Sequence, residues 1–413
     1  MRSGSPPVPS SLPEGDSAPA DGRLPPGVVD GAPERSLGLY VHIPFCAVRC
    51  GYCDFNTYTA DELDGVSRDS YPGSALLEMD LAATVLSEAG LPPRKLSSVF
   101  FGGGTPTLLG PEPLLRVLER ATDLWGLTPG AEVTIEANPD SVDKDDLAAL
   151  AQGGVTRVSV GVQSVVPSVL RTLDRTHTPE RVPLTVAAVK DAGLDVSVDL
   201  IFGSPGETLE QWDATVQAAI ELDPDHISAY SLIVEPGTAL ARRIQRGELP
   251  VPDDDLQAEM YVLADEAFSR AGYSWYEISN WAKSPQRESV HNRSYWSNED
   301  WWGIGPGAHS HVGGVRWWNV KHPSAYAKRL AEGVSPAHAR EVLLAEDQAL
   351  ERVLLGVRLR EGIPKEWIDP AKGPVIAEFI ARGLVDGRHA LAGRLVLTRA
   401  GRLVADHLVR ELT

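Results

Sequence analysis

Hydrophobic and polar positions follow two regular patterns over most of the chain: short apolar runs and longer amphipathic stretches. The apolar runs predict buried strands at 37–43, 98–101, 132–136, 156–161, 195–202, 226–232 and 274–278. Amphipathic stretches between them predict helices at 75–89, 113–125, 144–151, 179–192, 209–222 and 254–271. In the first of these, one helix face is predicted to carry Leu76, Leu77, Leu81, Val85 and Leu86.

Strands that alternate with helices predict an α/β fold with a parallel sheet and right-handed crossovers. With about six such units the pattern favours a partial (β/α)6 barrel, which we expect over 37–323, rather than a full eight-fold barrel. The pattern changes after this region. Residues 341–413 read as helix, helix, a strand–turn–strand around 391–397 and a closing helix over 401–412, which predicts a small winged-helix-like domain.

The charge of the chain argues against nucleic-acid binding. The 38 basic and 57 acidic residues give a formal net charge of −19, whereas non-specific binding depends on Lys and Arg that neutralise phosphates. The C-terminal region holds eleven acidic and eleven basic residues. A packing or partner-binding domain is therefore favoured there over a DNA-binding one.

The first 36 residues contain eight prolines and five glycines. Such a composition buries too little apolar surface to offset the entropy of ordering, and predicts a disordered tail over 1–36. No apolar run in the chain approaches the roughly 18–20 residues of a membrane helix, and residues 1–10 lack the apolar core of a secretory signal. We therefore expect a cytoplasmic protein without a membrane span.

The three cysteines of the chain are Cys46, Cys50 and Cys53. An odd set within eight residues cannot join distant loops by disulfides. Thiolates suit soft metals and iron–sulfur clusters, and three ligands leave one iron of a four-iron cluster open to a small molecule. The loop follows a strand, which places it at the carboxyl end of the sheet, where α/β proteins bind ligands. Structural cysteines, or a zinc site completed by His42, are the alternatives, although zinc sites usually have a second ligand pair.

The Cx3Cx2C spacing after a strand, with the aromatic Tyr52 before the last cysteine, resembles the radical S-adenosylmethionine (SAM) superfamily. The strings LYVHIPFC at 39–46 and FGGGTP at 101–106 are similar to the branch that holds oxygen-independent coproporphyrinogen III oxidase and the HemW haem chaperones. The similarity runs from about residue 37 to the C-terminus. It implies a radical SAM barrel with a [4Fe-4S] cluster on the three cysteines.

The resemblance also implies a set of SAM contacts in successive units. The glycine motif Gly102, Gly103, Gly104 and Thr105 follows the second strand, where glycine backbone groups can approach a charged ligand. The expected contacts from the other units are Tyr40, Glu136, Gln163, Arg175 and Asp199. Of these, Arg175 corresponds to the arginine that binds the methionine carboxylate, and Asp199 to the aspartate that binds ribose. Each of them taken alone is more often an ordinary polar residue near a strand end.

Two departures separate the branches. The oxidases carry a fourth cysteine two positions after the third, where this chain has Phe55, and they have an ordered N-terminal segment that the Pro/Gly-rich start of this chain does not suggest. The string HNRSYW at 291–296 resembles the HNxxYW motif of the haem chaperones. It lies among seven of the ten tryptophans, so His291 is a candidate haem ligand or gate. An aromatic core layer with a hydrogen-bonded His291 is the simpler alternative.

The glycine-rich loop 303–311 follows this motif. We interpret it as one wall of the cavity in which His291 would contact haem. Two hypotheses follow from the resemblance. One is a haem chaperone that holds haem, the cluster and SAM and delivers haem to an acceptor protein, with an unidentified electron donor. The other is an enzyme, the coproporphyrinogen III dehydrogenase that decarboxylates two propionates, so whether the chain is an enzyme stays open.

Overall fold

The computed structural model describes residues 12–63 and 67–413, and its centre is a curved sheet of thirteen strands. Six parallel strands form the middle of this sheet, each beside its neighbour in sequence. They are β2 (Leu37–Ile43), β3 (Leu96–Gly103), β4 (Leu127–Ala137), β5 (Arg157–Gln163), β6 (Asp195–Phe202) and β7 (His226–Ser231). Six of the seven residues of β2 are buried, as in a strand covered on both faces. The predicted partial (β/α)6 barrel is confirmed.

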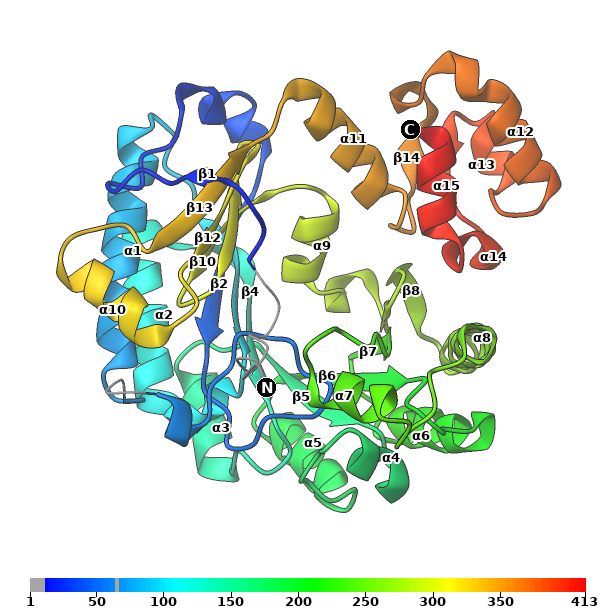
Figure 1. Ribbon diagram of the computed structural model, residues 1–413, viewed down its shortest axis with the longest axis horizontal. Helices are drawn as coiled ribbons and strands as arrows, with labels where there is room; N and C mark the ends of the chain where they lie inside the picture. Colours follow the sequence, from blue (N-terminus) through cyan, green and yellow to red (C-terminus); the bar gives the residue numbers. More distant parts are fainter. Residues whose placement is uncertain (1–11, 64–66) are drawn as a thin grey trace, which may run out of the picture.

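Helices cover the outer face of the parallel strands (Figure 1). Those that connect them are α1 (Tyr71–Glu88), α2 (Pro111–Trp125), α3 (Lys144–Gln152), α4 (Pro167–Thr172), α5 (Arg181–Asp191) and α6 (Leu209–Glu221). After β7 come α7 (Ala239–Gln245) and α8 (Asp254–Arg270). The short helix α9 (Val290–Trp296) lies inside the arc and contacts β3. Single 3-10 turns occur at Pro106–Leu109 and Pro285–Arg287, among other places.

The buried face of α1 differs from the predicted one. Ala75, Met79 and Ala82 are fully buried, whereas the predicted Leu77 is 48% exposed and Leu76 and Leu81 are only partly buried. The helix begins four residues earlier than predicted, and small side chains let it approach the sheet closely. The leucine spacing therefore identified the helix but misplaced its inner face.

Antiparallel strands extend the sheet on both sides. β10 (Asp300–Ile304) runs parallel to β2, and it is followed by β11 (His309–Val312), β12 (Val315–Asn319) and β13 (Ala337–Val342), which are antiparallel. α10 (Pro323–Ala331) connects β12 to β13. Beyond β7 lie β9 (Asn280–Ala282) and β8 (Ser274–Glu277). The predicted strand at 274–278 is thus an antiparallel edge strand, and the sheet continues to residue 342 rather than 323.

The prediction of a disordered tail is wrong for residues 12–36, and its first eleven residues lie outside the described part of the chain. Val28 and Ala32 are fully buried, and β1 (Asp16–Ser17) pairs with β13. Arg35 donates to the buried carboxylate of Asp300 at 2.8 Å. The N-terminal segment is ordered by hydrogen bonds to the edge strand β13 and by the ion pair with Asp300. Its own composition shows neither contact.

The C-terminal residues form a separate small unit with its own apolar core, beside α9 and β8 in Figure 1. Its helices are α11 (Ala345–Gly356), α12 (Gly373–Ala381), α13 (Gly387–Leu391), α14 (Arg399–Arg402) and α15 (Ala405–Leu412). The predicted strand–turn–strand around 391–397 is wrong, because β15 (Arg394–Leu395) pairs with β14 (Ile363–Pro364). The closing helix is divided into α14 and α15. Within the described residues, no helix is both long and apolar enough to cross a bilayer.

Candidate functional site: the cysteine loop and the adjoining cavity

The three cysteines lie on a loop that leaves the carboxyl end of β2, and all three thiols are free of disulfides. Backbone hydrogen bonds hold both halves of the loop. The Cys46 N–H donates to the Tyr58 carbonyl at 3.0 Å, the Gly51 N–H to the Leu173 carbonyl at 3.1 Å, and the Leu240 N–H to the Gly51 carbonyl at 2.7 Å. The loop is therefore fixed by the ends of β2, α4 and the start of α7 before any ligand binds.

The glycine motif after β3 packs against this loop. The Gly104 N–H donates to the Ile43 carbonyl and the Thr105 N–H to the Phe45 carbonyl, both at 2.7 Å. A Cβ on Gly104 would lie 2.4 Å from the Phe45 oxygen. The Gly103 N–H donates to Glu136 at 3.0 Å. These three N–H groups therefore already have partners in the chain, and the glycines permit close packing. Contact of the motif with SAM, through its carbonyl groups, stays a prediction.

Two partly buried carboxyl groups, Glu136 on β4 and Asp199 on β6, are close enough for the charge of one to act on the other. Burial raises the pKa of Glu136 to about 8, with a contribution from the charge of Asp199. Burial also raises the pKa of Asp199, although its Oδ2 accepts a hydrogen bond from Ser159 at 2.8 Å. A pair of carboxyls held above their usual pKa favours a cationic or hydroxyl-bearing ligand, which would relieve their repulsion.

Arg175 joins the cysteine loop to this region. Its Nη1 lies 3.5 Å from the Cys50 sulfur, and its Nη2 donates to the Gly161 carbonyl at 2.7 Å and to Asn138 at 2.8 Å. Its buried Nε has no hydrogen-bond partner among the described residues. An unpartnered buried donor is costly, so Nε is the part of the guanidinium that is suited to a ligand carboxylate.

The remaining predicted contacts support this arrangement. Gln163 is buried with φ of 62° at an irregularity of β5. Its amide lies near Gly161, where a Cβ would be 3.0 Å from Gln163 Nε2. The Thr105 hydroxyl accepts from the Asn138 amide at 3.1 Å. Tyr52 packs on an apolar cluster that includes Leu173 and Leu240, and so anchors the last cysteine rather than facing the cavity.

A cavity of about 560 Å³ lies beside the cysteine loop, within the range of ligand pockets. One side carries three of the predicted SAM contacts, Tyr40, Gly103 and Glu136. The other residues around it come from the N-terminal segment, β2, the end of the cysteine loop, α9, β10, the loop from β10 into β11, and the segment after β12. These are Leu12, Pro13, His42, Asp54, Phe55, Asn56, Tyr295, Trp301, Gly307, Ala308, His309 and Lys321.

His291 does not face this cavity. It is 2% exposed; its Nδ1 is hydrogen-bonded to the Ser98 hydroxyl at 2.9 Å and its Nε2 to the Tyr295 hydroxyl at 2.8 Å. Its ring stacks on Phe100 with centroids 5.0 Å apart. Burial lowers its pKa to about 3. The arrangement matches the simpler alternative, a hydrogen-bonded core histidine, and leaves no ring nitrogen for haem iron.

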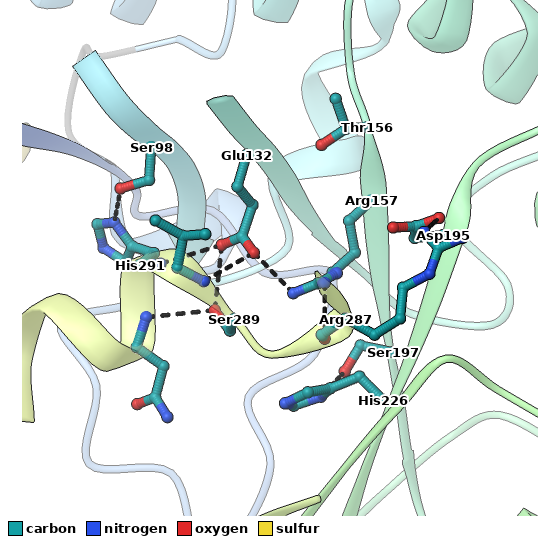
Figure 2. Close-up of polar contacts among 12 residues, drawn as sticks. Ser98, Glu132, Thr156, Arg157, Asp195, Ser197, His226, Arg287, Ser289 and His291 are labelled. Atoms are coloured by element: carbon teal, nitrogen blue, oxygen red, sulfur yellow. Dashed lines mark hydrogen bonds and ion pairs between the residues drawn. The ribbon is translucent and has the colours of Figure 1, made fainter. Parts of the chain in front are cut away.

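A buried ion pair fixes the helix that carries His291. Figure 2 shows the Glu132 carboxylate between Arg157 and the start of α9. It accepts from Arg157 at 2.7 Å, from the Ser289 hydroxyl at 3.1 Å, and from the backbone N–H groups of Val290 and His291 at 3.0 and 3.1 Å. A carboxylate at the first turn of a helix is favourable. No local sequence pattern indicates this contact, because its partners are distant in the chain.

Three free thiols on one loop are a donor set suited to an iron–sulfur cluster, whereas among the described residues no three His, Cys, Asp or Glu side chains are grouped to hold a single metal ion. Burial raises the pKa of Cys53 to about 12 and raises that of Cys46, so binding of iron to these thiols must release protons. Arg175 supplies a positive charge beside Cys50. The zinc alternative fits less well, because both ring nitrogens of His42 are engaged, by the Tyr40 hydroxyl and the Asn56 carbonyl, each at 2.9 Å.

Sequence reasoning missed two asparagines of the site. Asn138 bridges Arg175 and Thr105. Asn56 donates to the carbonyls of Pro306 and Lys321, at 2.9 and 2.8 Å, and so ties the cysteine loop to the cavity wall. The position of Asn138 directly after Glu136-Ala137 at a strand end was the available signal. Nothing in the local pattern marked Asn56.

The chain is similar to known proteins over most of its length. The family model described as the radical SAM superfamily matches residues 40–219. The protein named "Heme chaperone HemW" of Mycobacterium tuberculosis is 47% identical over 381 residues, which cover 92% of this chain and 95% of that protein. The Bacillus subtilis protein of the same name is 35% identical, with 89% and 97% covered.

A solved structure has the same fold. The coproporphyrinogen III oxidase (HemN) of Escherichia coli, described as a radical SAM enzyme, matches with a TM-score of 0.78 at 24% identity. The match covers 94% of this chain and 92% of that one.

Proposed function

Because the chain belongs to the radical SAM superfamily and, within it, to the HemW haem-chaperone family, we propose that it binds haem and delivers it to an acceptor protein. In this proposal a [4Fe-4S] cluster on Cys46, Cys50 and Cys53, together with SAM, supports haem binding or transfer. The acceptor and an electron donor are partners of the proposal. We place its action in the cytoplasm, where the three thiols stay reduced.

The observation that carries the proposal is the position of Phe55. This residue takes the place where the oxidases have a fourth cysteine. It lines the cavity and yet is 57% exposed. An exposed aromatic side chain at a cavity mouth costs free energy in water and suits a large apolar ligand such as a porphyrin face. Trp301 and Tyr295 continue this aromatic lining, with ring centroids 4.7 Å apart.

The residues around the loop have separable tasks. The cluster and SAM, when bound, supply reductive cleavage of the sulfonium carbon–sulfur bond. Arg175 offers its Nε to the SAM carboxylate, and the carboxyls of Glu136 and Asp199 offer acceptors to the amine and ribose hydroxyls. Phe55 and Trp301 keep water from the mouth of the cavity and hold the macrocycle at its rim.

The test is a haem titration with a matched activity assay. Full-length protein is purified anaerobically, reconstituted with iron and sulfide, and titrated with ferric haem while the Soret band is recorded. We expect stoichiometric binding, and no protoporphyrinogen from coproporphyrinogen III with SAM and dithionite. Phe55→Ala should weaken haem binding, whereas Val48→Ala, 52% exposed on the same loop but outside the cavity lining, should not. Substrate-dependent formation of protoporphyrinogen, or absence of haem binding, would contradict the proposal.

A further inference from the structure

We infer that His309, at the start of β11, supplies the protein ligand to haem iron at the mouth of the cavity. The inference rests on the haem binding proposed above and specifies the residue that performs it. It replaces His291, whose two ring nitrogens are occupied in the core.

The cavity lining contains two histidines, His42 and His309. His42 is 5% exposed, and both of its nitrogens are hydrogen-bonded within the chain. Ligation by His42 would therefore require the loss of the contact to Tyr40 or to Asn56. The His309 side chain is exposed and, among the described residues, its imidazole forms no hydrogen bond. It is thus the histidine of the cavity whose ring nitrogens can reach a metal without displacing a partner.

The backbone and ring of His309 are nevertheless held in place. Its carbonyl accepts from the indole N–H of Trp301 at 3.2 Å. Its ring stacks on Trp318 across the β11–β12 pair, with centroids 5.9 Å apart and planes at 27°. Trp318 is 2% exposed, so the indole on which the imidazole stacks is itself held in the core. An imidazole whose backbone is held in place and whose ring nitrogens have no hydrogen-bond partner is preorganised to bind a metal.

Close packing behind His309 requires glycine at two positions, Gly303 and Gly15. A Cβ on Gly303 would lie 2.2 Å from the His309 carbonyl oxygen, and one on Gly15 would lie 2.8 Å from the Trp318 ring. β10 therefore approaches β11 closely at this point, and the N-terminal segment packs directly behind Trp318. The two glycines allow the position of His309 to be fixed from both sides.

The electrostatic surroundings keep the imidazole in the form that binds metal. Desolvation by the surrounding cavity wall and the positive charges of Lys321 and Arg316 lower the pKa of His309, although part of its side chain is open to solvent. A lowered pKa favours the neutral imidazole, which is the form that binds metal. Lys321 also lines the cavity, where a positive charge complements the propionate groups of haem.

The role left for His291 is that of a positioning residue. It joins Ser98 on β3 to Tyr295, which lines the cavity, and Figure 2 shows its ring directed at Ser98. Its substitution should shift Tyr295 and alter haem affinity. It should not remove the nitrogen ligand.

The experiment compares His309→Ala, His291→Gln and His338→Ala by ferric-haem titration of the full-length protein, with electron paramagnetic resonance and absorption spectra of each complex. His338 is an exposed histidine on β13 outside the cavity lining and serves as the control. We expect His309→Ala to lose the imidazole-ligated spectrum, and free imidazole to restore it. His291→Gln and His338→Ala should keep it. Because the His309 side chain is exposed and makes no hydrogen bond to any residue in the described part of the chain, its removal should leave the circular dichroism spectrum unchanged.

The outcomes separate the two proposals. A wild-type protein that binds no haem contradicts the proposed function and the inference together. A His309→Ala protein that binds haem with the wild-type spectrum overturns the inference alone. If His291→Gln loses the imidazole-ligated spectrum and His309→Ala keeps it, the inference is also overturned, and His291 on α9 is the haem ligand. If His309→Ala fails to fold, His309→Met replaces it, and an unchanged spectrum of that complex has the same meaning.

Discussion

The Nη1 of Arg175 lies 3.5 Å from the sulfur of Cys50, although 125 positions separate the two residues. The same guanidinium holds the Gly161 carbonyl and Asn138. Arg175 therefore connects the cysteine loop to the ends of β4 and β5, and a change in its position would change the surroundings of the Cys50 sulfur.

Replacement of Arg175 by Ala should weaken both cluster retention and SAM binding. The change removes a charge-assisted contact to Cys50 and leaves the Gly161 carbonyl without this donor, and outer-sphere changes of this kind cost about 10- to 100-fold in affinity. Iron per chain after reconstitution and gel filtration, and SAM binding by equilibrium dialysis, measure the effect. Arg171→Ala, an exposed arginine on α4, should behave as wild type; equal losses in both variants would contradict the assignment.

Replacement of Gly104 by Ala should displace the cysteine loop while the barrel stays folded. The added Cβ would meet the Phe45 carbonyl at 2.4 Å, and a backbone atom cannot rotate away. We expect a clear loss of reconstituted iron with an unchanged far-ultraviolet spectrum. Gly73→Ala in α1, where a Cβ meets nothing within 4 Å, should raise stability by up to about 1 kcal/mol. Full iron content in Gly104→Ala would show that the close packing is not needed.

Removal of the Arg157 side chain should destabilise the protein by about 3–5 kcal/mol, because it leaves the Glu132 carboxylate buried without its cation. The two side chains are 4% and 6% exposed. Urea unfolding followed by circular dichroism measures the change. Lys144→Ala breaks an ion pair whose side chains are 77% and 70% exposed and should cost at most about 1 kcal/mol. Similar losses in both variants would refute a special role for the buried pair.

The stability of the protein should depend on pH through Glu78, a buried residue of α1. Its carboxylate accepts from the Gly305 N–H and Asn319 at 2.7 Å each, and from Tyr326 at 2.5 Å. Burial nevertheless raises its pKa from 4.5 to about 7. Between these values the folded state holds more protons than the unfolded state, so this group makes stability fall as pH rises, by up to about 1.4 kcal/mol per pH unit.

Glu78→Gln should remove that contribution. The free energy of unfolding of the variant, measured from pH 4.5 to 7, should fall less steeply than that of the wild type. Glu88→Gln, an exposed change at the end of the same helix, provides the matched comparison and should keep the wild-type slope. Parallel slopes for wild type and Glu78→Gln would contradict the prediction.

The parts of the site that lie at the ends of parallel strands could be predicted from the sequence. The alternation of strands and helices places Cys46, Glu136 and Asp199 at one edge of the sheet, because parallel strands all end there. Phe55 was identified as a departure from the oxidases, and it lies at the cavity mouth. The family resemblance identified which residues belong to the site. The alternation of strands and helices predicted that these residues lie at the same edge of the sheet.

The parts that depend on distant contacts could not be predicted. The N-terminal segment is ordered by β13 and by Asp300, and neither is visible in its own composition. The motif leaves His291 either a haem ligand or a core histidine, and only the contact with Ser98 on β3 shows that it lies in the core. His309 stood in a loop that the sequence marked only as a wall. His291 and His309 differ in whether their ring nitrogens already have hydrogen-bond partners. No sequence pattern shows this difference.

The order of strands in the sheet has a consequence for synthesis. The cysteine loop is made early, whereas β10, β11 and β13, which complete the cavity and hold the N-terminal segment, are made after residue 299. Domains fold as they leave the ribosome, so the three thiols leave the ribosome well before the wall with His309 exists. A nascent chain therefore passes through a stage in which its three cysteines are open to solvent and to iron, and only the nearly finished chain can close the cavity beside them.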